Sequence, residues 1–388
     1  MPPLAIYAGR ALTPLEEVAD AAVLIADGRI AALGPRKEVR VPAGSGEYDA
    51  TDMTVVPGFV DIHIHGAGGR DVMEATSEAL AAVAVTLARR GTTSFVATTV
   101  TASAEDTCRS LEGIARYTTS LQNRARGRAE VLGIHLEGPF INPLRRGVHP
   151  GDSIARPSVE LLERLLAAAG GSARILTMAP ELPGALDLAE RARHRGLVVA
   201  LGHTDATYAQ ARAAIELGVR HAVHVFNAMR PFSHRETGVL GAILTDPEVT
   251  AELIADGIHV DSVAIRILLA AKGAGRVLLV SDGTAATGMP DGTYRLGTFE
   301  VTVAGGVCRN HEGRLAGSTL TLDRALRHMV SLGVPLVEAV RMATIQPALR
   351  IGVAARKGVL QTGADADLVF LTPQLEVAKV MNRGAWLE

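Results

Sequence analysis

The chain alternates short apolar runs, rich in valine, isoleucine and leucine, with longer alanine-rich segments of helical composition. Segments 77–91 and 207–218 predict helices, because each ends on a glycine just past its last apolar residue. Short runs without polar alternation are typical of parallel strands that are buried on both faces. After a first run that ends at His63, they lie at 93–97, 131–135, 175–178, 198–201, 222–225, 252–254 and 277–280. Eight strand-helix units of this kind predict a closed (β/α)8 barrel of the TIM type.

At both ends of the chain the pattern changes to strand-like runs joined by turn signals. In the N-terminal segment, Asp27-Gly28 between two apolar runs predicts a tight hairpin with positive φ at the turn. Segments 365–371 and 375–384 also have strand character. Neither end has enough apolar surface to fold alone, so we expect residues 1–55 and 355–388 to pair into a small β-sandwich domain.

The remaining residues, 56–354, form the catalytic barrel domain on this interpretation. Within them, segment 291–314 interrupts the alternation of strands and helices with hairpin-like signals. We expect this segment to be an insertion over the mouth of the barrel.

Composition and charge narrow the class of protein. With 48% hydrophobic residues, a net charge of −2 and no basic run, the sequence predicts a large aliphatic core and a small-molecule ligand rather than nucleic acid or membrane. Its two cysteines, Cys108 and Cys308, lack the spacing of a disulfide framework or a zinc knuckle, which fits a reducing cytoplasm. No apolar segment reaches the roughly 18 residues that span a bilayer, and the N-terminus lacks the features of a secretory signal.

Candidate chemistry lies at the ends of the apolar runs, where a parallel barrel carries its active site. The potential metal-binding and catalytic side chains are His63, His65, Glu137, His203, His224 and Asp282. The two histidines of the first run are two residues apart, so on a strand both imidazoles point to the same side, as chelation requires. Alone, this pair is as easily an exposed or hydrogen-bonded histidine pair as a ligand pair. The other histidines and the glutamate favour the ligand interpretation.

The two carboxylates could also have purely structural roles. A carboxylate between imidazole pairs can bridge two divalent cations, but Glu137 could also be an acid near a helix start beside Pro139. Asp282 precedes Gly283 and could be a simple turn residue. Its position after the last apolar run favours a general acid/base, which takes a proton from water and passes it to a departing amine.

Motifs along nearly the whole chain carry a family resemblance. In order they are PGFVDIHIHG, HLEGPFINPLRRGVHP, TMAPE, LGHTDA, HVFNAM, SHRETG, IADGIHVD, VSDGT, LAGST and MATIQPALRIGVAARKGVLQTGADADLVFL. Through them the chain resembles the amidohydrolase superfamily and, within it, the N-acetylglucosamine-6-phosphate deacetylases. Residues 144–146 and Gln346 depart from the family's pattern, although neither lies among the proposed reacting groups.

The resemblance implies a role for each matching position. Glu137, His203 and His224 match ligands that the family shares, while His63 and His65 match a pair that only some members retain, so one or two divalent ions can bind. Histidine and carboxylate ligands leave zinc, iron, cobalt and manganese open. The other implied roles are Asp282 as general acid/base, His149 at the acetamido carbonyl, Asn227 and the Ala228 amide at the sugar phosphate, and Arg235 and His259 at phosphate and sugar.

The implied activity is hydrolysis of N-acetyl-D-glucosamine 6-phosphate to glucosamine 6-phosphate and acetate, in amino sugar catabolism and cell-wall recycling. The implied assembly is a homodimer in which Arg235 arrives from the neighbouring subunit. A solvated surface arginine, a capping histidine at His259 and a structural histidine at His149 are the corresponding plain alternatives.

Other functions stay open at this point. An N-acetylgalactosamine-6-phosphate deacetylase or another N-acyl hydrolase would share the metal set. A cyclic amidase would carry a carboxylated lysine as bridging ligand, against which Glu137 argues. If the protein were a non-catalytic metal-binding scaffold, we would expect some ligand or acid/base residues to be missing, but all six are present. A dinucleotide-binding loop is not favoured either, because HGAGGRD lacks the required glycine spacing.

Overall fold

The computed structural model describes residues 2–387, and its centre is a parallel sheet of eight strands in the order β14-β13-β12-β11-β10-β9-β8-β5. Backbone pairing also joins the two outer strands, because Asp282 N–H donates to His63 O over 2.9 Å and Ile64 bridges Gly283. The sheet therefore closes into the expected barrel. Its strands are β5 (Phe59–Ile64), β8 (Thr92–Thr99), β9 (Glu130–Glu137), β10 (Ala173–Met178), β11 (Val198–Leu201), β12 (His221–Ala222), β13 (Thr250–Leu253) and β14 (Val277–Leu279).

The barrel strands are buried on both faces, as their sequence pattern predicts. All residues of β5, β8 and β9 are buried, and Phe59 and Phe95 are among the largest fully buried side chains. Strand β12 is shorter than its apolar run, because the chain turns at His224, whose φ is 28°. Left-handed backbone of this kind ends a strand.

Helices surround the barrel and begin at residues suited to that position. Thr76, Ser103 and Ser158 each accept a hydrogen bond from a backbone N–H in the first turn of the helix that follows. The helices are α1 (Ser77–Ala88), α2 (Ala104–Thr119), α3 (Val159–Ala168), α4 (Ala185–His194), α5 (Tyr208–Glu216), α6 (Gly238–Thr245), α7 (Ser262–Lys272), α8 (Leu322–Ser331), α9 (Leu336–Ala343) and α10 (Ile345–Arg350). Within residues 2–387, no helix has the length and apolar character needed to cross a membrane.

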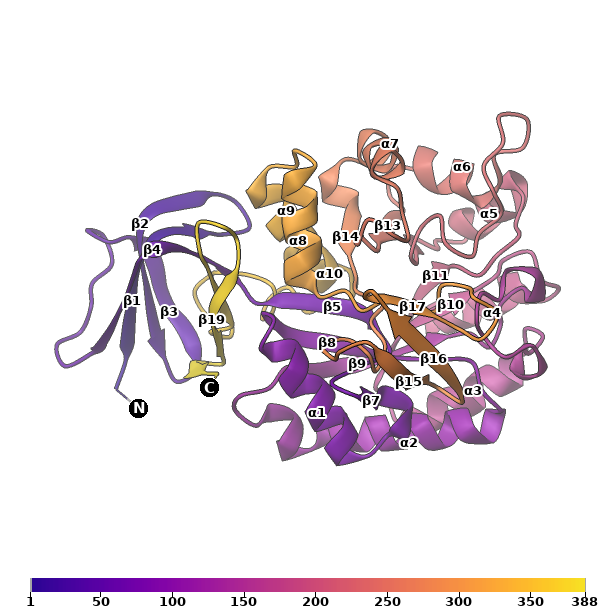
Figure 1. Ribbon diagram of the computed structural model, residues 1–388, viewed down its shortest axis with the longest axis horizontal. Helices are drawn as coiled ribbons and strands as arrows, with labels where there is room; N and C mark the ends of the chain where they lie inside the picture. The colour runs from indigo at the N-terminus through magenta and orange to yellow at the C-terminus, as the bar shows by residue number, and fades with distance from the viewer. Residues whose placement is uncertain (1, 388) are drawn as a thin grey trace.

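The N-terminal and C-terminal segments of the chain meet in a second sheet, which lies beside the barrel (Figure 1). Its strand order is β20-β19-β18-β4-β1-β2-β3, from β1 (Leu4–Leu12), β2 (Glu17–Ala26), β3 (Arg29–Pro35), β4 (Gly46–Pro57), β18 (Leu368–Leu371), β19 (Val377–Asn382) and β20 (Ala385–Trp386). The hairpin turn at Asp27 and Gly28 has φ of 50° and 76°, as expected. Ile30 N–H donates to Ala364 O, so the β3 edge folds back toward the C-terminal segment around a core that includes Phe370. We propose boundaries near residues 55 and 355 for this small domain.

A cluster of charges joins the barrel to the returning C-terminal segment. Lys357 is fully buried, and its ammonium lies 3.0 Å from Glu130 at the start of β9, 3.0 Å from Asp365 and 2.7 Å from Asp367. Arg356 makes a second contact with Glu130, at 2.8 Å. We refer to these five residues as the junction cluster. Buried charges need such mutual pairing to remain ionised.

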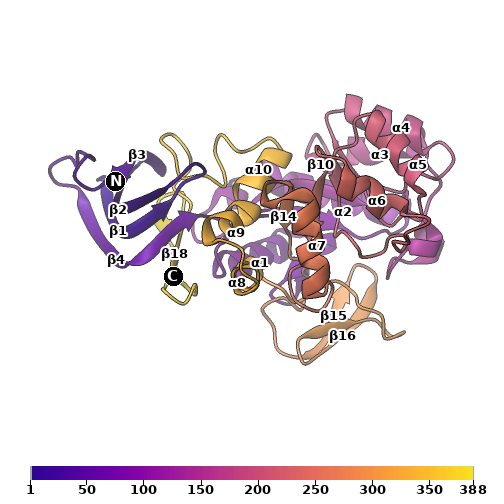
Figure 2. The same ribbon diagram turned by 90° about the horizontal axis from the view of Figure 1, so that it is seen from above.

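A smaller antiparallel sheet stands at the barrel mouth. It comprises β15 (Gly292–Leu296), β16 (Phe299–Ala304) and β17 (Val307–Arg309), and it projects from the body of the barrel in Figure 2. A short strand pair below it, β6 (Gly66–Ala67) with β7 (Arg70–Asp71), provides an anchor, because Asp71 Oδ2 accepts from Gly297 N–H over 2.8 Å. Leu296 also packs with Val100 of the barrel. The sheet is thereby held over the site.

Candidate metal centre and active site

All six side chains singled out in the sequence come together at the carboxyl ends of the barrel strands. His63 lies on β5 and His65 just after it, while Glu137 is the last residue of β9. His203, His224 and Asp282 each follow a strand and have positive φ, which turns them out of the sheet toward the centre. The five proposed ligands are no more than 5% exposed. The barrel topology therefore converts six distant positions into one buried cluster.

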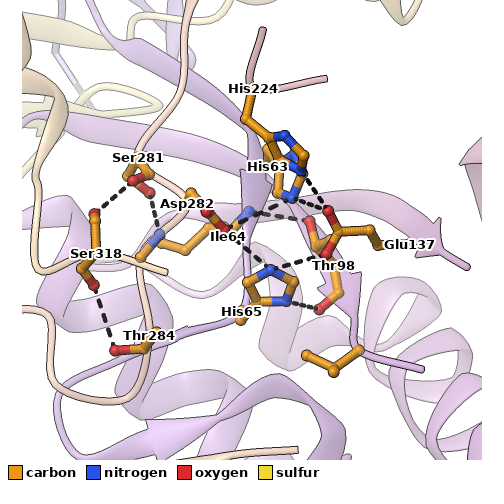
Figure 3. A network of polar contacts seen from close by, with 12 residues as sticks. His63, Ile64, His65, Thr98, Glu137, His224, Ser281, Asp282, Thr284 and Ser318 are labelled. Carbon is orange, nitrogen blue, oxygen red and sulfur yellow. Dashed lines mark hydrogen bonds and ion pairs between the residues drawn. The ribbon is translucent and has the colours of Figure 1, made fainter. Parts of the chain in front are cut away.

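Glu137 is the centre of this cluster (Figure 3). Its Oε1 lies 2.9 Å from His224 Nε2, 3.2 Å from His203 Nε2 and 3.2 Å from His63 Nε2. Its Oε2 lies 3.3 Å from His65 Nε2, which is 3.1 Å from Asp282 Oδ1. One carboxylate thus contacts all four imidazoles, an arrangement suited to bridging two cations.

The protonation states of the cluster favour anionic carboxylates. Burial alone would raise the pKa of Glu137, but the surrounding imidazoles hold it well below its usual value. Burial likewise opposes ionisation of Asp282, yet its contacts with His65 and His63 lower its pKa. Burial lowers the pKa of His203 to about 4, so its imidazole is neutral, as a metal ligand must be.

His65 differs from His203. Although burial would lower its pKa, contacts with Asp282 and Glu137 raise it to about 10. In the metal-free protein this imidazole therefore holds a proton that a cation must displace on binding.

The donor set fits a divalent cation. Three overlapping groups of side chains could each hold an ion, because within each group the ligand atoms lie within 4.8 Å of one another. The groups are His63, His65 and Asp282; His63, Glu137 and His224; and Glu137, His149 and His203. Nε2 of His63 is buried and lies 3.2 Å from Glu137 Oε1, so it is placed to ligate an ion beside that carboxylate. Imidazole and carboxylate donors suit several first-row metals.

The outer nitrogens of two ligands are held by backbone carbonyls. Nδ1 of His65 lies 3.0 Å from Thr98 O, and Nδ1 of His203 lies 2.9 Å from Arg145 O. A carbonyl oxygen only accepts, so each Nδ1 carries the hydrogen and each Nε2 faces the centre unprotonated when metal is bound. Arg145 contributes here through its main-chain carbonyl.

Beside the cluster opens a pocket of about 210 Å³. It contains His149, Asn227, Ala228 and His259 among the residues expected to contact substrate. The remaining expected residue, Arg235, lies on an exposed loop and does not line the pocket of this chain. Part of the wall is apolar and consists of Val100, Val148, Leu296 and Leu315.

His149 is oriented by its neighbour Thr101. The backbone N–H of Thr101 donates to His149 Nδ1 over 3.2 Å, so that nitrogen accepts and Nε2 carries a hydrogen. Nε2 lies 3.4 Å from Glu137 Oε2, at the edge of the cluster. His149 therefore presents a hydrogen-bond donor to the pocket.

The other pocket residues also have defined partners. His259 Nδ1 lies 2.7 Å from Asp256 Oδ2; burial opposes its protonation, but that carboxylate raises its pKa. Asn227 donates through its amide to His224 O over 3.3 Å. Ala228, which has φ of 51°, also lines the pocket, and its carbonyl accepts from Thr204 N–H over 3.1 Å.

The Amidohydrolase family profile matches residues 54–387, which include the complete cluster. The chain belongs to this amidohydrolase family. Among its curated relatives is an N-acetylglucosamine-6-phosphate deacetylase of Bacillus subtilis (strain 168), 35% identical over 381 residues, 96% of this chain and 94% of the relative. Another is an N-acetylgalactosamine-6-phosphate deacetylase of Escherichia coli O157:H7, 38% identical over 98% of each chain.

Solved structures agree with the family assignment. A mutant of the Mycobacterium smegmatis N-acetyl-D-glucosamine-6-phosphate deacetylase, in complex with N-acetyl-D-glucosamine-6-phosphate, has a TM-score of 0.92 at 39% identity over 100% of both chains. The N-acetylglucosamine-6-phosphate deacetylase of Pasteurella multocida has a TM-score of 0.92 at 30% identity over 99% of both chains.

Some residues of this amidohydrolase site were not anticipated from sequence. The apolar wall depends on Leu296 and Leu315, which reach the pocket only because the β15–β17 sheet folds back over the barrel. Glu252, in β13, contacts His63, whereas the sequence pattern predicts only an apolar strand at this place. A charged residue inside a buried run is rare, and this feature of the sequence could have marked Glu252 as a residue with a specific partner.

Proposed function

We propose that this amidohydrolase is a divalent-metal-dependent deacetylase that hydrolyses the acetamido group of N-acetyl-D-glucosamine 6-phosphate, giving glucosamine 6-phosphate and acetate. One observation carries the proposal: the buried cluster around Glu137 opens onto a pocket that holds a general acid/base, an oriented histidine and an apolar wall. The names of the Bacillus subtilis and Mycobacterium smegmatis relatives point to the same substrate.

We infer that Glu137, His203 and His224 hold one ion and that His63 and His65 provide a second position beside it. Zinc, iron, cobalt and manganese all suit these donors. When bound, the ion polarises the acetamido carbonyl and lowers the pKa of water, so that hydrolysis proceeds at neutral pH. A second position built on the same carboxylate would make the number of ions depend on metal concentration.

Asp282 is the proposed general acid/base. Its carboxylate is ionised, lies 3.1 Å from His65 Nε2 and lines the pocket, so it can take a proton from the attacking water. Attack on the carbonyl carbon gives a tetrahedral intermediate. Asp282 then returns the proton to nitrogen, the C–N bond breaks, and the amine leaves while acetate remains.

His149 is proposed to stabilise the oxygen that gains charge in this step. Thr101 holds its Nδ1, so Nε2 carries a hydrogen at the pocket wall, 3.4 Å from Glu137 Oε2, before substrate arrives. Donors fixed in advance stabilise an oxyanion without reorganisation during the reaction. The apolar wall of Val100, Val148, Leu296 and Leu315 offers a place for the acetyl methyl group.

The sugar and phosphate contacts are proposed for the residues on the far side of the pocket. Asn227, the Ala228 amide and His259 would hold the sugar phosphate, with His259 kept protonated by Asp256. Arg235 would complete the phosphate site from the neighbouring subunit of a homodimer, because a guanidinium donates two parallel hydrogen bonds to a phosphate. A phosphorylated amino sugar also fits the expected role in cytoplasmic amino sugar catabolism.

The test is acetate release from N-acetylglucosamine 6-phosphate, with unphosphorylated N-acetylglucosamine alongside. The protein is stripped with a chelator and refilled with zinc, iron, cobalt or manganese. We expect metal-dependent release from the phosphorylated sugar and little from the other. No release with any of the four metals would contradict the proposal.

A second candidate substrate is N-acetylgalactosamine 6-phosphate. The specific observation is the Escherichia coli O157:H7 relative of that name, which matches 98% of this chain at 38% identity. Comparison of kcat/KM for the two epimers in the same assay decides between them. The epimer with the larger kcat/KM is the physiological candidate.

A further inference from the structure

A buried glutamate stands behind the proposed metal centre. Glu252 lies in the middle of β13, in the barrel interior, and is 0% exposed. An unpaired carboxylate in such a place is strongly disfavoured, so its partners explain its presence.

Three hydrogen-bond donors converge on this carboxylate. Oε2 lies 2.8 Å from His63 Nδ1 and 3.3 Å from the backbone nitrogen of His224, while Oε1 lies 2.9 Å from His221 Nε2. A carboxylate only accepts, so each of these nitrogens carries a hydrogen. The other nitrogen of His221 lies 2.8 Å from Thr250 Oγ1, whose one hydrogen can go to that nitrogen or to Arg220 O, 3.1 Å away.

This network fixes which nitrogen of His63 faces the metal position. With an ion bound, the hydrogen on Nδ1 of His63 leaves the lone pair of Nε2 facing the side of Glu137 Oε1, 3.2 Å away (Figure 3). The same carboxylate holds the backbone of His224, whose Nε2 lies 2.9 Å from Glu137 Oε1. One group thus orients a ligand of each proposed metal position.

Glu252 also differs in charge from the partners of the other ligands. His65 and His203 are held by the neutral carbonyls of Thr98 and Arg145, whereas His63 is held by an anion. A carboxylate behind an imidazole makes the metal-facing nitrogen a stronger donor and offsets the charge of the cation.

We infer that Glu252 is a positioning residue of the metal centre, which fixes the tautomer of His63 and sets the affinity of the position that His63 serves. This inference rests on the metal site of the proposed function. It adds a residue outside the expected ligand set, and it places control of the second metal position in a strand that contributes no ligand.

Glu252→Gln is the informative variant. The amide oxygen can still accept from His63, while the amide nitrogen can donate to His221 if that ring transfers its hydrogen to the nitrogen facing Thr250. The variant keeps the volume and the hydrogen bond from His63 and removes the charge, with a change of tautomer at His221. Glu252→Ala removes both. Thr177→Val is the matched control, because Thr177 is equally buried in the barrel and bonds His135, which is outside the proposed ligand set.

The measurement is metal affinity, which does not depend on turnover. Metal-free proteins are titrated with zinc in competition with a chromogenic chelator, and bound metal is counted after dialysis at fixed free zinc. We expect Glu252→Gln to weaken one zinc position about 10-fold and Glu252→Ala about 100-fold, the range typical of outer partners of metal ligands. Thr177→Val should match the wild type.

Equal affinities for the wild type and Glu252→Gln would overturn the inference, even where the wild type binds zinc and releases acetate. A wild type that binds no zinc would overturn the metal site itself, and this inference with it. If neither variant folds, long-range ¹H–¹⁵N spectra of the zinc-loaded wild type decide, with His63→Gln used for assignment. A hydrogen on Nδ1 of His63 is expected, and a hydrogen on Nε2 would refute the role.

Discussion

Glu130→Gln tests how much the junction cluster stabilises the protein. Burial would raise the pKa of Glu130, but Arg356 and Lys357 lower it from the usual 4.5 to about 2. At about 1.4 kcal/mol for each unit of pKa, this difference corresponds to about 3 kcal/mol of unfolding free energy at neutral pH. We therefore expect the variant to lose up to about 3 kcal/mol at pH 7.

The pH dependence follows from the sign of the shift. The folded pKa is depressed, so the unfolded chain binds more protons between the usual 4.5 and about 2. The contribution is complete above the unfolded value and is lost as pH falls toward the folded one. By linkage, about 1.4 kcal/mol of it is gone at pH 3.5.

The assay is urea unfolding of the wild type and the variant at pH 7 and pH 3.5. Glu163→Gln serves as control, because that glutamate pairs with Arg191 and Arg195 at the surface, where an ion pair contributes about 1 kcal/mol or less. A gap between wild type and Glu130→Gln that stays the same at both pH values would refute the reasoning, as would no gap at pH 7.

Three further predictions concern the site. Asp282→Asn should fold and keep its metal yet lose about 10²- to 10⁴-fold in kcat, checked by acetate release and metal content; full activity would remove its role. Arg235→Ala should lower kcat/KM for the phosphorylated sugar about 10- to 100-fold and spare the unphosphorylated one, and an equal loss on both would contradict phosphate binding. Leu296→Ala should raise the propionyl to acetyl ratio of kcat/KM about 10-fold, since one methylene is worth about 1 to 3 kcal/mol; an unchanged ratio would place the acyl group elsewhere.

The sequence was informative wherever a strand meets a loop. Glu137 and His203 each follow an uninterrupted apolar run, and parallel strands bring their carboxyl ends to one rim, so the cluster followed from topology. The hairpin at Asp27-Gly28 could be predicted in the same way, because its turn requires positive φ and this pair of residues adopts it readily. Local chemistry and regular topology were sufficient in these cases.

Contacts between segments far apart in the chain could not be predicted from the sequence. Glu252 meets His63 across 189 positions, and no spacing rule connects a residue inside one strand with a residue at the end of another. Leu296 lines the pocket only because Asp71 ties the β15–β17 sheet to the barrel. Arg235, exposed on this chain, is assigned by resemblance alone.

The position of β4 has a consequence for biosynthesis. This strand pairs with β1 along one edge and with β18 along the other, where Val56 lies opposite Val369. It also continues through a single glycine into β5, the first strand of the barrel. On a ribosome, β4 is made early, but the partner for its second edge emerges only after the barrel sequence has been translated. A nascent chain that stalls before residue 368 therefore exposes an unpaired apolar strand edge, the kind of surface that chaperones bind and that aggregates when left uncovered.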